Sequence, residues 1–437
     1  MSATDIKDLI KSNLCTGCGM CVSESNRTLK MEWNDFGFIE PSEIDSPIPE
    51  NAIKVCPFNP EPEEEVKDED RLAELFLKNA TKHDDKLGRF ENTYAGYSNE
   101  YRESSSSGGI ATYVFEQLLI RKVVDFLYVV KEKEGSYEYQ LYHNPDDIKR
   151  ISKSRYIPVT MEKLFLEINN LEGKVAISGV ACFVKAIRLK QHYNPQLKEK
   201  IPFVVGIMCG GWKSTFFTDF LAQSSGINSE YHKPEYRLKD SNSPATDYSF
   251  GAFDEKDQFS QMKMSTVGDM WGTGMFKSRA CDFCTDVTTE LADVSLGDAW
   301  LPEYYSDGMG TSVIITRSPL ADLIIEEGIR ANELTVSPVL KEKVIQSQRA
   351  SFMHRQTALS FRMKMNKLNG LLLPNIRTRV LGRITFTYAV VQFLRNLVRG
   401  RSLVYWHKTR DINRFKKKMK PLLLVLKLST KVYHKFR

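Results

Sequence analysis

The chain has 437 residues, 42% of them hydrophobic, and is longer than one hydrophobic core usually supports, so we expect two or three domains. The sequence has no basic segment followed by an apolar one at its start and no run of about 18 apolar residues, so we expect neither a secretory signal nor a membrane-spanning helix. The net charge of +6 conceals an asymmetry: residues 377–437 hold 17 lysines and arginines against one acid, which leaves −10 on residues 1–376.

Four cysteines near the N-terminus have the spacing of ligands to an iron–sulfur cube. Three follow one another at two-residue intervals, a distant cysteine before a proline supplies the fourth thiolate, and Ser25 stands where a two-cluster ferredoxin has its next cysteine. We predict that residues 1–60 form a ferredoxin-type domain with one [4Fe–4S] cluster, with zinc or a disulfide as alternatives. Thiols that serve clusters favour a reducing, cytoplasmic location. The four ligands would be Cys15, Cys18, Cys21 and Cys56.

An acidic run follows the cysteine-proline pair. It extends from residue 61 to residue 70 and leads into a helix-like pattern of leucine and phenylalanine. A run of acids is usually solvated, so we interpret residues 61–90 as an acidic linker that contains a hinge and the start of a helix.

Residues 91–350 alternate between strand-like and helix-like patterns. A strand at 93–97 is followed by a loop of serine and glycine at 104–109 and a helix at 110–119. Glycine-rich loops before a helix are suited to holding anions, because the first amides of the helix are unpaired; a flexible linker is the alternative. This alternation predicts a mostly parallel sheet covered by helices.

Two further strand–helix units each place a cysteine at the carboxyl end of a strand. Cys182 follows the strand-like run at 173–179, and Cys209 lies at the carboxyl end of the strand in the run at 203–211. Ligands gather at that edge in open α/β sheets. Hairpins are expected between residues 236 and 275, and Cys281 and Cys284 come next. These four cysteines complete a second set of cube ligands, although a zinc site or buried core thiols explain them equally well at this point.

Six ordered segments resemble the beta-subunit family of coenzyme F420 hydrogenases and dehydrogenases. They are SSSGG at 105–109, KSRY at 153–156, GVAC at 179–182, IMCGG at 207–211, CDFC at 281–284 and DVSLGDAW at 293–300. The resemblance implies a bound flavin, FAD rather than FMN, and a second [4Fe–4S] cluster. The cluster ligands that it implies are Cys182, Cys209, Cys281 and Cys284. Coenzyme F420 is a further cofactor of the family, with no contacts assigned to named residues.

The resemblance also implies which residues lie around the flavin. The serine–glycine loop would approach it, a lysine and a tyrosine would lie near it, and a glycine and an aspartate would shape a loop beside it; for the aspartate, a turn or helix cap is an equally good interpretation. In that order the residues are Ser106, Ser107, Gly108, Gly109, Lys153, Tyr156, Gly297 and Asp298.

The predicted fold class is therefore α+β, with a small ferredoxin-like [4Fe–4S] domain, an α/β flavin-binding body and a basic helical C-terminal tail. The predicted function is an oxidoreductase that moves electrons between a ferredoxin-like carrier or reduced deazaflavin and an organic substrate, through two clusters and FAD. Bacterial relatives in the family suggest surface-polysaccharide biosynthesis, with a glycan precursor as substrate. The alternatives are a non-catalytic electron-transfer subunit of a larger complex and a zinc-stabilised, membrane-associated assembly protein. No catalytic acid or base is identifiable.

The last segment, residues 351–437, mixes basic residues with leucine and aromatic residues and is predicted to form amphipathic helices. Basic amphipathic helices lie on anionic membrane surfaces, and a leucine-rich tail suits lipid better than nucleic acid. We expect residues 377–437 to hold the protein peripherally on the inner face of the cell membrane, with a docking surface for a partner enzyme as the alternative.

Overall fold

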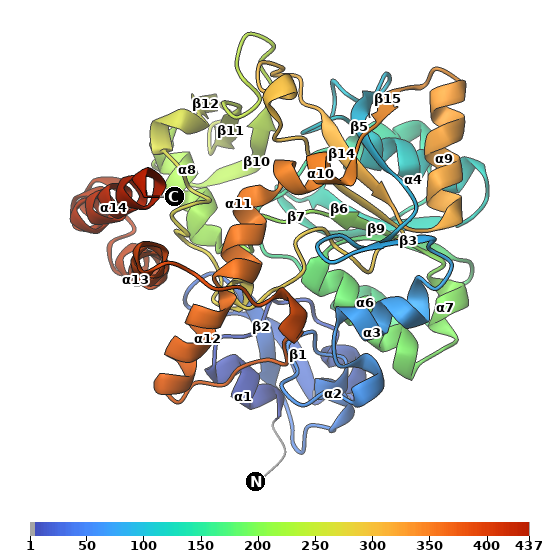
Figure 1. The fold of residues 1–437 in the computed structure, drawn as a ribbon, viewed down its shortest axis with the longest axis horizontal. Helices are drawn as coiled ribbons and strands as arrows, with labels where there is room; N and C mark the ends of the chain where they lie inside the picture. The colour runs from blue at the N-terminus through green and yellow to red at the C-terminus, as the bar shows by residue number, and fades with distance from the viewer. Residues whose placement is uncertain (1–4, 437) are drawn as a thin grey trace.

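The computed structural model describes residues 5–436, and Figure 1 shows their arrangement. An N-terminal unit lies lowest in the view, a large sheet with helices on both faces lies above it, and two long C-terminal helices form the left edge. The expected mixture of helices and strands and the helical C-terminus are confirmed. The ferredoxin-like and flavin-binding assignments stay predictions.

The largest sheet among residues 5–436 has eight strands. Three of its seven neighbouring pairs are parallel and four are antiparallel, so the prediction of a mostly parallel sheet is wrong. One reason is a tight hairpin at one edge, where Glu134 and Gly135 both have the positive φ that two-residue hairpin turns use. In spatial order the strands are β15 (Leu334–Pro338), β5 (Thr93–Ser98), β14 (Ser312–Thr316), β13 (Val294–Asp298), β9 (Phe203–Ile207), β8 (Val175–Val180), β6 (Phe126–Lys133) and β7 (Ser136–Tyr142).

Both faces of the inner strands are buried, because successive side chains point to opposite sides. On β8, Val175 and Ile177 pack in one core cluster and Ala176 packs in the other. One face is covered by α4 (Ile110–Ile120) and α9 (Pro319–Arg330), and the other by α3 (Glu69–Phe76), α5 (Glu162–Glu167), α6 (Ala181–Tyr193) and α7 (Leu197–Lys200).

The N-terminal unit is built on a hairpin and two short helices. Its first helix begins at Asp5, whose carboxylate accepts a hydrogen bond from the amide of Asp8 at 3.0 Å and so caps the helix. Leu9 and Phe58 pack there against Phe283 and Leu359, so this unit is joined to the rest of the molecule by an apolar core. The elements are α1 (Ile6–Lys11), β1 (Leu29–Trp33), β2 (Ile39–Glu43) and α2 (Asn51–Lys54).

The segment expected to be a solvated acidic linker is packed against the body. Glu64 and Glu65 are exposed, but Asp68 and Glu69 are buried, and Leu72 is part of the core beneath the main sheet. The expectation of solvation is therefore wrong for the second half of the acidic run: Asp68 accepts backbone hydrogen bonds that cap α3, and Glu69 pairs with the buried Lys185 and Arg377. A small hairpin, β3 (Lys82–Asp84) and β4 (Gly88–Phe90), follows.

The expected hairpins between residues 236 and 275 are confirmed as a three-stranded antiparallel sheet of β10 (Tyr231–Leu238), β11 (Ser249–Asp254) and β12 (Phe259–Lys263). Its apolar side shares a core cluster with α8 (Thr215–Ser224) and the two long helices α13 (Phe386–Thr409) and α14 (Ile412–Lys435). The chain reaches them through α10 (Lys341–Ser347), α11 (Arg349–Phe352) and α12 (Leu359–Leu368). None of the helices formed by residues 5–436 has the length and apolar character needed to cross a membrane.

Candidate functional site

The first four cysteines surround a single hollow of about 390 Å³, although residue 56 lies 35 positions after the third cysteine. Gly17 and Gly19 have φ values of 73° and 77°, and this backbone turns the amide of Gly17 toward the sulfur of Cys15 at 3.3 Å. The predicted ligands Cys15, Cys18, Cys21 and Cys56 are thus brought together.

Burial makes these thiols weak acids in the absence of a cation. Burial, as the largest cause, and the negative charge of a neighbouring thiolate together raise the pKa of Cys15 and Cys56 to about 12. Thiols that resist ionisation together in this way are typical of ligands that lose their protons to a bound metal centre.

The second four cysteines come from three separate regions of the chain. β8 and β9 are parallel neighbours, so Cys182, in the first turn of α6, and Cys209, just after β9, lie at the same edge of the sheet. Cys281 lies in a short 3-10 turn, and Cys284 follows it. The thiol of Cys182 interacts electrostatically with the other three, which shows that the set converges.

Backbone amides and one arginine point at the sulfurs of this second set. The amide of Gly211 donates to Cys209 Sγ at 3.3 Å, and the amide of Trp212 donates to Cys281 Sγ at 3.1 Å. Arg355 donates to Cys284 Sγ at 3.5 Å and also to the backbone carbonyl of Cys209. Donors of this kind orient metal-binding thiolates and offset their negative charge.

The two cysteine sets are neighbours in space. Cys182 and Cys284, from the second set, pack against the apolar cluster that contains Cys21, from the first. The buried Thr16, next to Cys15 in the chain, lies close enough to Cys182 to lower the pKa of that thiol, against the larger, raising effect of burial. A second hollow of about 330 Å³ is lined both by Pro57, which follows Cys56, and by Cys182 and Cys284. Within residues 5–436, no three histidine, cysteine, aspartate or glutamate side chains are grouped so as to hold a single metal ion.

The serine–glycine loop is held in one conformation by three neighbouring segments. Ser106 Oγ accepts a hydrogen bond from the amide of Ser154 at 2.8 Å, and the amide of Gly108 donates to Ser312 Oγ at 3.1 Å. A Cβ atom at residue 108 would lie 2.6 Å from the carbonyl oxygen of Gly96, so only glycine fits there. Gly109 then caps α4 with a φ of 79°.

The remaining predicted flavin contacts lie around β10. Lys153 pairs with Glu235 at 2.7 Å, and Arg237, two residues further on the same strand, pairs with Asp298 at 2.5 Å. Burial is the main cause that raises the pKa of Tyr156, and the nearby positive charge of Arg237 opposes it. Gly297 lies beside Asp298 on β13, where a Cβ atom would lie 2.4 Å from Met208 Sδ.

Two buried polar atoms around this loop have no hydrogen-bond partner among the described residues. They are Ser105 Oγ and Nε of Arg237. Lys239 donates to the carbonyl oxygens of Ser107, at 2.7 Å, and of Arg102. Its pKa is lowered to about 7, first by burial and then by the positive charges of Arg102, Arg237 and Lys153. Unpaired donors beside a lysine whose ammonium meets backbone carbonyls fit an anionic ligand such as the phosphate groups of a dinucleotide.

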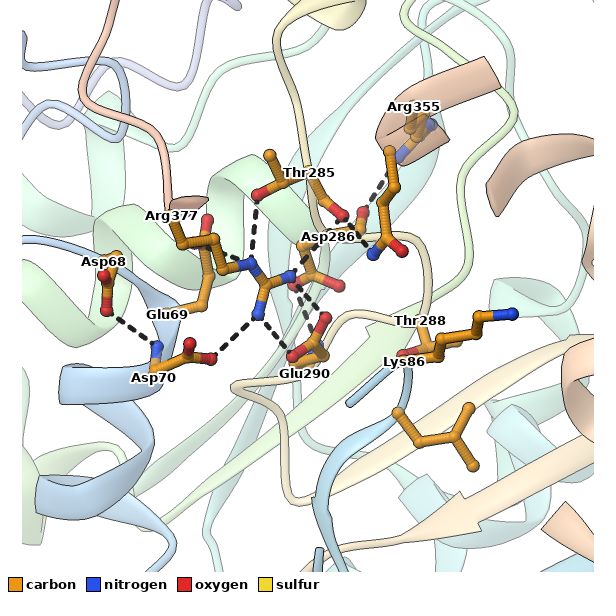
Figure 2. A network of polar contacts seen from close by, with 12 residues as sticks. Asp68, Glu69, Asp70, Lys86, Thr285, Asp286, Thr288, Glu290, Arg355 and Arg377 are labelled. Atoms are coloured by element: carbon orange, nitrogen blue, oxygen red, sulfur yellow. Dashed lines mark hydrogen bonds and ion pairs between the residues drawn. The ribbon is translucent and has the colours of Figure 1, made fainter. Parts of the chain in front are cut away.

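A buried charge network, drawn in Figure 2, holds the loop that follows Cys284. Arg377 binds Glu290 through two hydrogen bonds of 2.7 and 2.5 Å and binds Asp70 at 3.1 Å. Arg355 donates to the backbone carbonyl of Asp286 at 2.9 Å and thereby ties this loop to the second cysteine set.

Sequence reasoning missed Arg355, Arg377 and Thr16, because none belongs to a recognisable motif and both arginines lie in the segment predicted to be a basic tail. A weak signal was available for Thr16, which stands inside the first cysteine motif. The predicted cysteines lie in two sets, and the residues predicted to contact the flavin lie on the serine–glycine loop and around β10.

Comparisons with known proteins agree with this geometry. A family model described as coenzyme F420 hydrogenase/dehydrogenase, beta subunit N-term, matches residues 93–165, and the model for the C terminus of the same beta subunit matches residues 172–342. The coenzyme F420 hydrogenase subunit beta of Methanothermobacter thermautotrophicus is 23% identical over 253 residues, which are 56% of this chain and 82% of that protein. The coenzyme F420 hydrogenase subunit beta of Methanosarcina barkeri is 21% identical over 251 residues, which are 56% of this chain and 80% of that protein.

A solved structure shares the fold. A chain from the xenon-derivatised F420-reducing [NiFe] hydrogenase complex of Methanosarcina barkeri aligns with a TM-score of 0.52 and 18% identity. The alignment covers 68% of this chain and 99% of that one. At this level of identity the likeness concerns the fold alone.

Proposed function

Because the chain belongs to the coenzyme F420 hydrogenase/dehydrogenase beta-subunit family, we propose that it is an iron–sulfur flavoprotein oxidoreductase with two [4Fe–4S] clusters and FAD. Membership makes it a redox protein related to the electron-transfer subunits of hydrogenases. The observation that carries the proposal is the proximity of the two cysteine sets: Cys182 and Cys284 pack against the apolar cluster that contains Cys21, and they line one hollow together with Pro57. Such proximity suits the passage of electrons between two clusters.

The proposed cluster ligands are the two sets described above. In the first set, four cysteines surround one hollow and the amide of Gly17 points at the sulfur of Cys15; in the second, the amide of Trp212 points at the sulfur of Cys281. Both arrangements fit the donor set of a cube. Zinc remains the competing ion, since its sites also use four cysteines. In this proposal the first set belongs to a ferredoxin-type domain of residues 1–60, and the second to a body of residues 91–350, with 61–90 between them and the helical segment 351–437 after them.

FAD is proposed to lie against the loop of residues 105–109, with Lys153, Tyr156 and Asp298 around it. The unpaired donors of Ser105 and Arg237 and the cationic surroundings of Lys239 support this position. When bound, the clusters would supply transfer of single electrons and the flavin would supply exchange of a hydride with an organic substrate. Three further assignments are proposals that rest on the family alone. They are coenzyme F420 as a cofactor, a ferredoxin-like protein as electron carrier, and a glycan precursor in polysaccharide biosynthesis as substrate.

The role of the chain's own residues follows from their contacts. Arg355 and the amide of Trp212 place positive charge and hydrogen-bond donors at the sulfurs of the second set. Such donors stabilise negative charge on metal-binding thiolates. Arg237 holds the carboxylate of Asp298 in a fixed position and stacks on Trp300 at 5.6 Å. Arg355 and Arg237 are buried, so water is largely excluded from these two charges.

A second candidate function is a non-catalytic electron-transfer subunit. It is favoured by the names of the relatives, each of which is one subunit of a hydrogenase. Reduction of the purified protein by reduced F420, NADH and ferredoxin in turn separates the two. Turnover of an added organic acceptor by this chain alone supports the oxidoreductase, whereas reduction without turnover supports the electron-transfer role.

Anaerobic purification followed by metal, sulfide and flavin analysis tests the cofactors. We expect about eight iron atoms and one FAD per chain, with broad visible absorption from the clusters. Cys56→Ser and Cys284→Ser should each remove about half of the iron, with Ser25→Ala as a matched control that keeps it all. A colourless protein with stoichiometric zinc would contradict the proposal and favour the zinc-stabilised assembly protein.

A further inference from the structure

Helix α14 is attached to the body by one face only. Phe415, Met419, Leu426 and Tyr433 point into the core cluster shared with α8 and α13. In Figure 1 the pair α13–α14 lies at the left edge of the molecule, away from the main sheet, and α13 meets the N-terminal unit through His407, which contacts the backbone carbonyl of Asp35. The opposite face of α14 is therefore free of contacts with the main sheet.

That outward face carries a row of exposed apolar side chains. Leu424, Leu428, Val432 and Phe436 follow one another at intervals of four residues and are 54%, 53%, 46% and 72% exposed. Side chains four apart lie on one side of a helix, so these form a continuous stripe, which Val425 widens. Single exposed apolar residues are ordinary, whereas an aligned row on an outer helix marks a contact surface.

A row of lysines borders the stripe. Lys427, Lys431 and Lys435 each stand three residues after a member of the apolar row and are exposed. In total α14 contains seven lysines and one arginine, all exposed, and no acidic residue. The surface therefore combines positive charge with an apolar centre, and the helix supplies no acid to balance its charge.

We propose that the outward face of α14 lies in the plane of a membrane rich in anionic phospholipid, with the apolar row in the acyl region and the lysines at the headgroups. Charge complementarity favours this occupant, because an anionic lipid surface satisfies lysines and leucines at once. A nucleic acid would leave the leucines and valines without a partner, and a second copy of the chain would bring two rows of lysines together. This surface is separate from the redox site, and the inference does not depend on which cofactors are bound.

Co-sedimentation with vesicles tests the proposal on the full-length protein. The vesicles are equal mixtures of phosphatidylglycerol and phosphatidylcholine, compared with vesicles of phosphatidylcholine alone. Each lysine near an anionic surface changes the partition coefficient about fivefold, so the triple variant K427Q/K431Q/K435Q should bind about 100-fold more weakly. A control that removes equal charge from other exposed positions, K78Q/K174Q/K256Q, should bind like the original protein.

The variant L424S/L428S/V432S separates lipid insertion from simple charge attraction. It keeps every lysine, and we expect a loss of about tenfold or more because the apolar contact is gone. Unchanged circular dichroism is required of all variants and is expected, since each altered side chain is exposed. Equal binding of the lysine variant and its control would overturn the proposal. So would tight binding to duplex DNA without vesicle binding, or a dimer in solution that the serine variant abolishes.

Discussion

Replacing Arg377 by methionine removes the cation that binds Glu290 through two hydrogen bonds in the network of Figure 2. The arginine side chain is 1% exposed and that of Glu290 is 3% exposed, so neither charge is screened by water. Removal of one partner of a buried ion pair leaves the other charge uncompensated and costs about 3–5 kcal/mol of stability.

Arg379 provides a matched control two residues away. It pairs with the same Asp70, at 2.6 Å from both of its contacting nitrogens, but its side chain is 26% exposed. A pair that water can reach contributes about 0–1 kcal/mol, so Arg379→Met should change stability little. The two variants have similar chemistry and differ mainly in burial.

Urea unfolding followed by circular dichroism measures the difference. With a slope of about 3 kcal/mol per molar urea, the midpoint should fall by about 1–1.7 M for Arg377→Met and by at most about 0.3 M for Arg379→Met. Adding Glu290→Gln to the first variant should recover some of the loss, because the uncompensated charge is removed. Equal midpoints for the two arginine variants would refute the reasoning that burial decides the strength of these pairs.

Three further predictions concern the candidate site. The pKa of Lys239 is about 7 in the folded protein and 10.5 in the reference state, so the unfolded chain binds more protons between these values. The flavin-free protein should therefore gain stability relative to Lys239→Met as the pH rises from about 7 to 10, which melting curves at several pH values check. Gly108→Ala should lose flavin and about 1–3 kcal/mol of stability, because its new Cβ atom meets backbone. In thermal melts the control Gly400→Ala should be as stable as the original protein or more so, because a Cβ atom there has no other atom within 4 Å. Arg355→Met removes a charged hydrogen bond to sulfur and should lower the midpoint potential of one cluster by about 60–130 mV in a redox titration, with the other cluster unchanged as the internal control.

The pattern of strands and cysteines was readable from the sequence because it depends on local order. Around Cys182, and again around Cys209, the sequence shows a buried strand, then small residues, then a helix. Parallel neighbouring strands bring their carboxyl ends to one edge of the sheet. The loop of residues 105–109 was recognisable for a similar reason, since glycine is required where backbone atoms approach closely.

Sheet direction and buried charges were not readable in this way. The antiparallel neighbours of the inner strands depend on which distant segments meet, as with β5 and β15, which are joined in space but separated by more than 230 residues. Arg377 and Glu290 lie 87 positions apart, and a charged residue in a basic segment is normally solvated. Local propensity carries no information about such pairings.

The charge split along the chain now has two separate causes. Some of the basic excess of residues 377–437 is used inside the fold, because Arg377 and Arg379 meet Asp70, and Arg399 pairs with Asp282 at 3.0 Å. Their acidic partners contribute to the −10 of the preceding residues, so the imbalance partly reflects the two sides of a single internal network. The lysines of α14 are different, since no acid lies on that helix and all of them are exposed. The proposed anionic membrane surface therefore concerns the charge of α14 and not that of the segment from 377 to 399.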